Sequence, residues 1–225
     1  MKIFQTNFHG DHNLGLYGKA SARFCLIGNF VTDKDHDRIS EMLGVKLFRT
    51  TAANTDLAGM FFAINSNGIL FPKITTEKEK SKLRILKKEL GLNICELKTK
   101  YTALGNLILA NDKGAVVPSI FSRLDVNRIK DILGVEVENA TVAAMKILGS
   151  AGIATNKGCL VHRDASEEET KRIEEILKVK VDIGSANFGS PFVGACMIGN
   201  DKGAIIGDST TGPEVTRIME SLNLL

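Results

Sequence analysis

The chain of 225 residues contains no tryptophan, only 4 prolines and no strong excess of charge of either sign. Its 29 Lys and Arg against 26 Asp and Glu leave a net charge of +3, which is too small for a histone-like nucleic-acid binder. No stretch approaches 18 apolar residues, and the N-terminus lacks the apolar run of a signal peptide. The sequence therefore predicts a soluble, cytoplasmic protein with no membrane partner.

Cysteine and histidine are also scarce, with four of each and no C-x-x-C pair. A zinc site would need closely spaced pairs of these residues, which the spacing does not supply. The sequence therefore predicts no metal and no cofactor, and free cysteines buried as small apolar groups in a reducing compartment. These residues are Cys25, Cys95, Cys159 and Cys196, with His9, His12, His36 and His162.

What the sequence does contain is a repeat of about 45 residues. An Asn-x-x-Gly turn between apolar runs recurs at residues 65–72, 111–118 and 200–207, and again at 156–162 with a turn that reads one residue shorter. The turn glycines, spaced by 46, 44 and 45, are Gly68, Gly114, Gly158 and Gly203. A leading glycine precedes each turn, with spacings of 44, 46, 44 and 45, at Gly15, Gly59, Gly105, Gly149 and Gly194. Five such units account for the whole chain.

Each unit also carries the signals of one helix. A Ser or Thr suited to cap a helix recurs in the same phase, and an apolar residue follows seven positions later. The caps are Thr32, Thr76, Ser122, Ser166 and Thr211, and the apolar residues are Ile39, Leu83, Ile129, Ile173 and Ile218. The turn composition predicts a hairpin in which Gly supplies a positive φ. One unit is thus a hairpin, a helix and a further strand.

The fifth unit is divided between the two ends of the chain. Residues 200–225 end after a helix, whereas residues 1–20 contain the missing strands but no helix. Pairing the two ends would remove the exposed sheet edge of an open array. We therefore expect an α/β fold in one domain, residues 1–225, that forms a closed five-unit β/α propeller. Its pseudo-fivefold axis would have helices outside and strands inside, with the last unit completed by the N-terminal strands.

Four segments of the chain carry a further pattern: residues 102–115, 156–162 and 193–204, and the closing run Asp-Ser-Thr-Thr-Gly-Pro-Glu at 208–214. Together they resemble the translation initiation factor six family of archaea and eukaryotes. The closing run is the most specific, because the repeat alone does not dictate it. The resemblance covers essentially the whole chain and implies the pentein-type β/α propeller. The chain ends at Leu225 without the polar tail of eukaryotic members, so it looks like the archaeal form.

The resemblance implies a ribosome anti-association factor and not an enzyme. Family members bind the large ribosomal subunit on the face that joins the small subunit, against a ribosomal protein near the sarcin–ricin loop and possibly rRNA. Occupying that face blocks subunit joining, and in eukaryotes the factor also serves large-subunit maturation. A monomer without cofactor or small-molecule substrate is expected.

The predicted ribosome-binding residues form a rim around the axis. A ring of five units places the residue after each leading glycine at one end of the molecule, and the resemblance implies that family members dock through this rim. We call the following set the docking rim: Gly15, Leu16, Gly59, Met60, Gly105, Asn106, Gly149, Ser150, Ala151, Gly194 and Ala195. Asn106 is its clearest polar member, able to donate and accept hydrogen bonds. Eukaryotic members carry Arg at the position of Met60.

Two other features have competing interpretations. Residues 65–110 hold nine Lys or Arg against four Glu, so this segment either faces rRNA phosphate or is a solvated helix surface. The same fold also hosts guanidine-modifying hydrolases with a cysteine nucleophile, for which Cys196, or Cys159 with His162, are the candidates. Against the enzyme, both Cys159 and His162 fall at repeat positions that ordinary residues occupy elsewhere, and no insertion supplies a lid.

Overall fold

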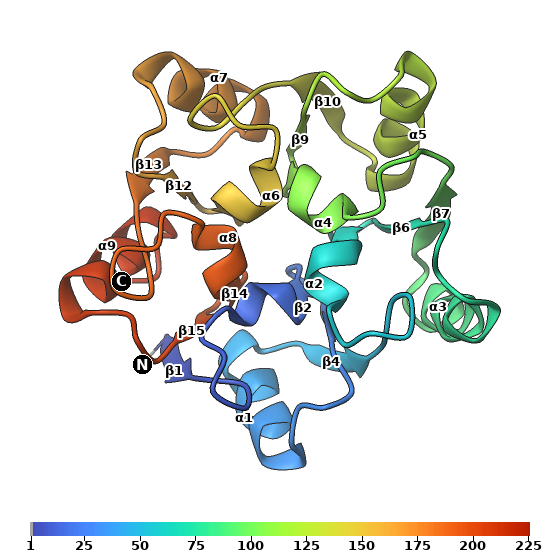
Figure 1. The fold of residues 1–225 in the computed structure, drawn as a ribbon, viewed down its shortest axis with the longest axis horizontal. Helices are drawn as coiled ribbons and strands as arrows, with labels where there is room; N and C mark the ends of the chain where they lie inside the picture. The colour runs from blue at the N-terminus through green and yellow to red at the C-terminus, as the bar shows by residue number, and fades with distance from the viewer. Residues whose placement is uncertain (1) are drawn as a thin grey trace.

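A computed structural model describes residues 2–225 as a mixed α/β fold with five small three-stranded sheets. In each sheet the middle strand pairs antiparallel with one neighbour and parallel with the other. The sheets are β2(Gly18–Ala20)-β3(Phe24–Ile27)-β4(Lys46–Arg49), β5(Ala63–Ile64)-β6(Gly68–Pro72)-β7(Asn93–Leu97), β8(Leu109–Ala110)-β9(Gly114–Val117)-β10(Glu136–Asn139), β11(Gly152–Ala154)-β12(Cys159–His162)-β13(Val181–Gly184) and β14(Met197–Gly199)-β15(Ala204–Gly207)-β1(Ile3–Thr6). Each unit is thus the predicted hairpin, helix and further strand, and the units surround a common centre (Figure 1).

Five long helices lie at the periphery, outside the strands as predicted (Figure 1). They are α1(Asp33–Leu43), α3(Glu77–Leu90), α5(Arg123–Leu133), α7(Glu167–Leu177) and α9(Gly212–Ser221). All five predicted Ser or Thr residues occupy the N-cap position, and in the first four a side-chain oxygen accepts a backbone N–H of the first turn. The five predicted apolar residues of the helices are completely buried. The helical part of the repeat is therefore confirmed.

The first and the last strands of the described chain belong to one sheet. Strand β1 pairs parallel with β15, with Ile3 opposite Ala204. Of the two N-terminal strands, only β1 completes the last sheet, because β2 pairs with β3 in the first. Among residues 2–225 the five sheets remain separate, and none closes on itself.

Five helical segments of a single turn lie around the centre of the molecule (Figure 1). They are η1(Leu14–Leu16), α2(Ala58–Phe61), α4(Leu104–Leu107), α6(Leu148–Ala151) and α8(Val193–Cys196). Each contains one leading glycine and leads into the first strand of a hairpin. The repeat located these positions, but their helical conformation was not predicted.

The turn glycines have a different role from the one expected. None of the four adopts a positive φ. A Cβ atom on Gly114 would instead lie 2.0 Å from the carbonyl oxygen of Ile176, near the end of α7 in the next unit. Gly68, Gly158 and Gly203 meet helix carbonyls of their own next units at 2.3, 1.9 and 2.6 Å. Glycine is required because neighbouring units pack closely, and the expectation of a left-handed turn was wrong.

The asparagines of these turns join neighbouring units. The Asn111 amide donates to the carbonyl oxygens of Thr155 and Leu177, at 3.0 and 2.9 Å, and Asn65 and Asn200 make equivalent bonds. In the fourth turn the hydroxyl of Thr155 accepts the N–H groups of Lys157 and Gly158, as the Asn111 side chain does for its own turn. The fourth turn is therefore not shorter than the others, because Thr155 replaces the asparagine.

No helix among residues 2–225 has both the length and the apolar character needed to span a bilayer.

Candidate functional site

The leading glycines hold the five single-turn helices against one another. A Cβ atom on Gly105 would lie 2.1 Å from the carbonyl oxygen of Gly59, and one on Gly149 would lie 2.1 Å from that of Gly105. The same contact links Gly59 to Gly15, and Gly194 to Gly149. Gly15 in turn would meet the carbonyl oxygen of Gly194, so the contacts run around the axis and return to their start. We call these five residues the glycine ring. Close packing of the backbone alone accounts for glycine at each of the five positions.

The docking rim contains both exposed and buried residues. The five glycines are buried, and so are Ser150, 7% exposed, and Ala151, completely buried. The residues that follow the other glycines are partly exposed: Leu16, Met60, Asn106 and Ala195. The structure thus brings the predicted rim residues together around the axis, but only these four offer side-chain surface to a partner. A binding role for them remains a prediction.

Asn106 is the polar group that the rim presents. Its backbone N–H donates to the carbonyl oxygen of Ala103, which fixes the residue within the turn of α4. Within residues 2–225 its side-chain amide makes no hydrogen bond, and the side chain is partly exposed. An amide held in place with its donor and acceptor free is suited to bind a polar group of a partner.

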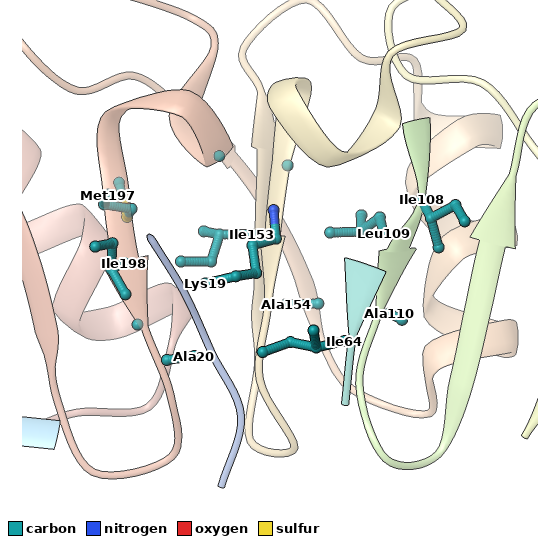
Figure 2. A pocket seen from close by; sticks show the side chains of 13 residues that line it. Lys19, Ala20, Ile64, Ile108, Leu109, Ala110, Ile153, Ala154, Met197 and Ile198 are labelled. Carbon is teal, nitrogen blue, oxygen red and sulfur yellow. The ribbon is translucent and has the colours of Figure 1, made fainter. Parts of the chain in front are cut away.

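Beneath the rim, a cavity of about 30 Å³ lies along the axis (Figure 2). Its wall consists of glycine and apolar residues from the inner strands, with one exception, Lys19. Lys19 extends among Ile153 and Ile198, and its nitrogen points toward the single-turn helices (Figure 2). Burial lowers the pKa of Lys19 to about 8. Sequence reasoning missed this residue, although a Lys in an inner strand where other units carry apolar residues was a usable signal.

Glutamates at three helix N-termini fix the loops that lead into the single-turn helices. The Glu169 carboxylate accepts the N–H groups of Ala143 and Ala144 at 2.9 Å, besides that of its own N-cap residue, Ser166. Glu79 and Glu214 hold the loops at Asn54 and Phe188 in the same way. These loops contain residues with φ of about 50–60°, and the carboxylates stabilise that conformation.

One of these loops presents Phe188, which is 83% exposed. Its N–H and that of Gly189 donate to Glu214, at 3.2 and 2.8 Å, and its φ is 60°. The loop directly precedes α8, which carries Gly194 and Ala195 of the rim. Phe188 was not selected from the sequence, although the equivalent loop positions in two other units hold Asn54 and Ala144.

The basic segment is distributed over both ends of the molecule. Lys80 contacts Glu77 and Glu96 at 3.0 and 2.7 Å, so part of its charge is neutralised within the protein. Lys87 and Lys88 lie in the last turn of α3, and strand β7 then carries the chain to the opposite end before α4 begins. The two lysines therefore lie away from Asn106. Neither of the competing interpretations of this segment is tested by these contacts.

The cysteines do not form the constellation of a thiol hydrolase. Burial raises the pKa of Cys196, and the hydrogen bonds with Ser190 and Asn187 do not offset this effect. Burial likewise raises the pKa of Cys159. The Nδ1 atom of His162 accepts the N–H of Asp164 and is thus engaged with the backbone. A nucleophilic cysteine needs a lowered pKa, so these surroundings do not favour the enzyme alternative. Within the described chain, no three His, Cys, Asp or Glu residues are grouped as metal ligands would be.

Five hairpin–helix–strand units around a central ring of short helices are consistent with a pentein-like repeat fold. The sequence model of the eIF-6 family matches residues 3–221, and the chain belongs to this family. It is 47% identical over 227 residues to translation initiation factor 6 of Pyrococcus furiosus and 45% identical over 228 residues to that of Thermococcus kodakarensis, with both chains covered completely. It is 41% identical over 224 residues to that of Saccharolobus solfataricus, with 99% of each chain covered. These relatives are archaeal initiation factors of protein biosynthesis.

Among solved structures, the N-terminal domain of a variant of ArgZ, covalently bound to a reaction intermediate, is similar with a TM-score of 0.45. The identity is 18%, and the similarity covers 75% of this chain and 67% of that chain. A similarity this weak carries no argument about activity.

Proposed function

We propose that this chain binds the large ribosomal subunit and prevents its premature association with the small subunit. The observation that carries the proposal is the match of the eIF-6 family along residues 3–221, together with full-length relatives named translation initiation factor 6. Such a factor acts in the cytoplasm in translation initiation and large-subunit biogenesis, and it acts by occupying a surface, without catalysis.

The architecture we propose for this role is one closed pentein-type propeller domain, residues 1–225, that acts as a monomer. Two features support closure: the pairing of β1 with β15, and the contacts of the glycine ring, which return from Gly194 to Gly15. A closed ring makes a rigid docking surface, and rigidity lowers the entropic cost of binding.

The docking rim is the surface we assign to the large subunit, against a ribosomal protein and possibly rRNA. Two observations support this choice. The rim collects residues from all five units at one end of the molecule, and Asn106 presents a side-chain amide without an internal partner. Leu16, Met60 and Ala195 surround it with small or apolar surface, as is typical of the centre of a protein–protein interface.

Sedimentation with separated ribosomal subunits tests the proposal. We expect the protein to sediment with the large subunit but not with the small one. Added before the subunits are mixed, it should lower the yield of joined ribosomes in proportion to the large subunits occupied. Equal sedimentation with both subunits, or an undiminished yield of joined ribosomes, would contradict the proposal.

A further inference from the structure

Lys19 replaces an apolar residue that the fold uses in every other unit. In the register of the five hairpins, Lys19 lies opposite Leu26, just as Leu109 lies opposite Val116. The equivalent residues of the five inner strands are Lys19, Ala63, Leu109, Ile153 and Ile198, and the four apolar ones are at most 8% exposed. The fold itself is therefore satisfied by an apolar side chain at this position.

The ammonium group of Lys19 reaches across the axis to the opposite side of the ring. Its Nζ atom donates to the carbonyl oxygens of Gly105 and Gly149, at 3.4 Å from each. Lys19 belongs to the first sheet, whereas these glycines lie in α4 and α6, which lead into the third and fourth sheets. The two carbonyls belong to the peptide groups that precede Asn106 and Ser150.

We propose that Lys19 is a positioning residue of the docking rim: its ammonium holds these two peptide groups from across the axis and thereby fixes Asn106 for binding. The inference rests on the proposed function. Lys19 is partly exposed, but its ammonium is withdrawn from water among apolar groups. Withdrawing a cation from water costs free energy, and a well-packed apolar residue is often as stable or more stable. A charge kept at such a position indicates a role other than stability.

The cavity contains nothing else that could balance or compete with this charge. Apart from Lys19, the residues that line it are Ala20, Ile64, Ile108, Leu109, Ala110, Gly152, Ile153, Ala154, Gly194, Met197, Ile198 and Gly199. None of these side chains is titratable, and among residues 2–225 the hydrogen-bond partners of the ammonium are the two glycine carbonyl groups. A neutral amine would hold them less strongly, because a charged donor makes the stronger hydrogen bond.

The pH dependence of affinity distinguishes a positioning role of Lys19 from a role in packing alone. The folded pKa of Lys19, about 8, lies below its ordinary value of 10.5. The protonated group therefore destabilises the fold, and stability rises as the pH increases from about 8 to 10.5. Affinity for the large subunit should change in the opposite direction and fall over the pH range in which the ammonium loses its proton.

The experiment compares Lys19→Met with Lys157→Met, which removes an exposed charge from a turn at the other end of the inner strands. Affinity for large subunits and the unfolding midpoint are measured for both variants and the wild type from pH 7 to 9.5. We expect Lys19→Met to bind at least roughly tenfold more weakly at pH 7, because the two charge-assisted hydrogen bonds that position Asn106 are lost, without a lower unfolding midpoint. Lys157→Met should keep the wild-type affinity and its decrease with pH.

A double variant tests whether Lys19 acts through Asn106. We expect Lys19→Met combined with Asn106→Ala to bind no more weakly than Asn106→Ala alone, because coupled residues are not additive. Wild-type affinity in Lys19→Met, or an additive loss in the double variant, would overturn the inference. If Lys19→Met does not fold, the pH profile of the wild type decides. An affinity that does not change between pH 7 and 9.5 would then overturn the inference. Absence of wild-type binding to large subunits contradicts the proposed function instead.

Discussion

At the scale of single residues, Asn106 combines a fixed backbone with a side-chain amide that has no partner among residues 2–225. If the rim docks on the ribosome, Asn106→Ala should cost on the order of 1–3 kcal/mol, which is roughly fivefold to 150-fold in affinity. The unfolding midpoint should stay unchanged, since the side chain makes no internal hydrogen bond. Affinity for large subunits and thermal unfolding of the same preparation measure the two effects.

The matched comparison for Asn106 is charge reversal at the other end of the molecule. Lys87→Glu with Lys88→Glu alters the last turn of α3, away from the rim, and should change affinity little at any salt concentration. Unaltered binding of the Asn106 variant beside strongly weakened binding of the lysine variant would mean that the other end docks. A smaller salt dependence in the lysine variant would then identify rRNA phosphate as the partner.

The four thiols differ mainly in burial, and this predicts their reactivity. Cys95 is partly exposed, whereas Cys25, Cys159 and Cys196 are buried. Burial raises the pKa of all four, so none is an activated thiolate at neutral pH. We expect iodoacetamide to modify Cys95 slowly and first, and the other three only after denaturation. Mass spectrometry of the alkylated peptides follows the order, and early modification of Cys196 would revive the enzyme alternative.

At the scale of elements, the N3 residue of each long helix determines whether the helix also holds a neighbouring loop. Glu79, Glu169 and Glu214 reach both the cap and a loop, whereas the shorter Asp125 of α5 bonds with its own cap residue, Ser122. Glu169→Asp should therefore keep the cap and release Ala143 and Ala144. We expect a loss of about 1–2 kcal/mol, since the two amides lose a charged acceptor. Chemical denaturation measures it, with the exposed Glu168→Asp as control.

Acid should weaken the same contacts. Burial alone would raise the pKa of Glu169, but the hydrogen bonds from Thr141, Ser166 and the loop amides outweigh it and lower the pKa below the ordinary 4.5. A carboxylate with a lowered folded pKa contributes stability above its unfolded pKa and loses it as the pH falls through the folded one. The wild type should therefore lose stability below about pH 4.5, and Glu169→Asp should lose less. Parallel losses in the two proteins between pH 6 and 3 would refute this assignment.

Some structural features of the repeat unit could be predicted from the sequence, and others could not. Caps and helix cores were predictable because a capping hydroxyl and an apolar row have local causes that recur in every unit. The single-turn helices were not, because four residues are too short to show a helical period. The turn glycines were located correctly but for the wrong reason, since the carbonyl that excludes a Cβ at Gly114 belongs to α7, more than 60 residues later. A contact between two units leaves no signal in the local sequence pattern of either unit.

At the scale of the whole molecule, the N-terminal strand is a structural part of the last unit. Deleting residues 1–10 would remove β1, and with it the buried side chains of Ile3 and Phe8. The edge of β15 would then be exposed. We expect a sharply lower melting temperature, whereas Lys2→Ala, which alters an exposed side chain, should leave it nearly unchanged. An unchanged melting temperature in the truncated protein would refute closure by the two ends.

The site was predictable only to the extent that the repeat determines it. Its position at one end of the axis followed from the phase of the leading glycines. The burial of Ser150 and Ala151 did not, because it depends on how closely five units approach at the centre. Phe188 and Lys19 depart from the repeat, and their surroundings come from segments distant in sequence, such as Glu214 for the first and Gly149 for the second.

Because the two ends of the chain lie side by side, the fold does not depend on where along the ring the polypeptide starts. Lys2 donates to the carbonyl oxygen of Leu225 at 3.0 Å, and β1 lies beside β15. A short linker could therefore join the ends, and new termini could be opened in the exposed turn at Lys157. Such a circular permutant would exchange one interrupted unit for another while all five sheets kept their partners. The contacts between neighbouring units determine the arrangement around the axis, and with it the rim. The order in which the ribosome synthesises the units does not.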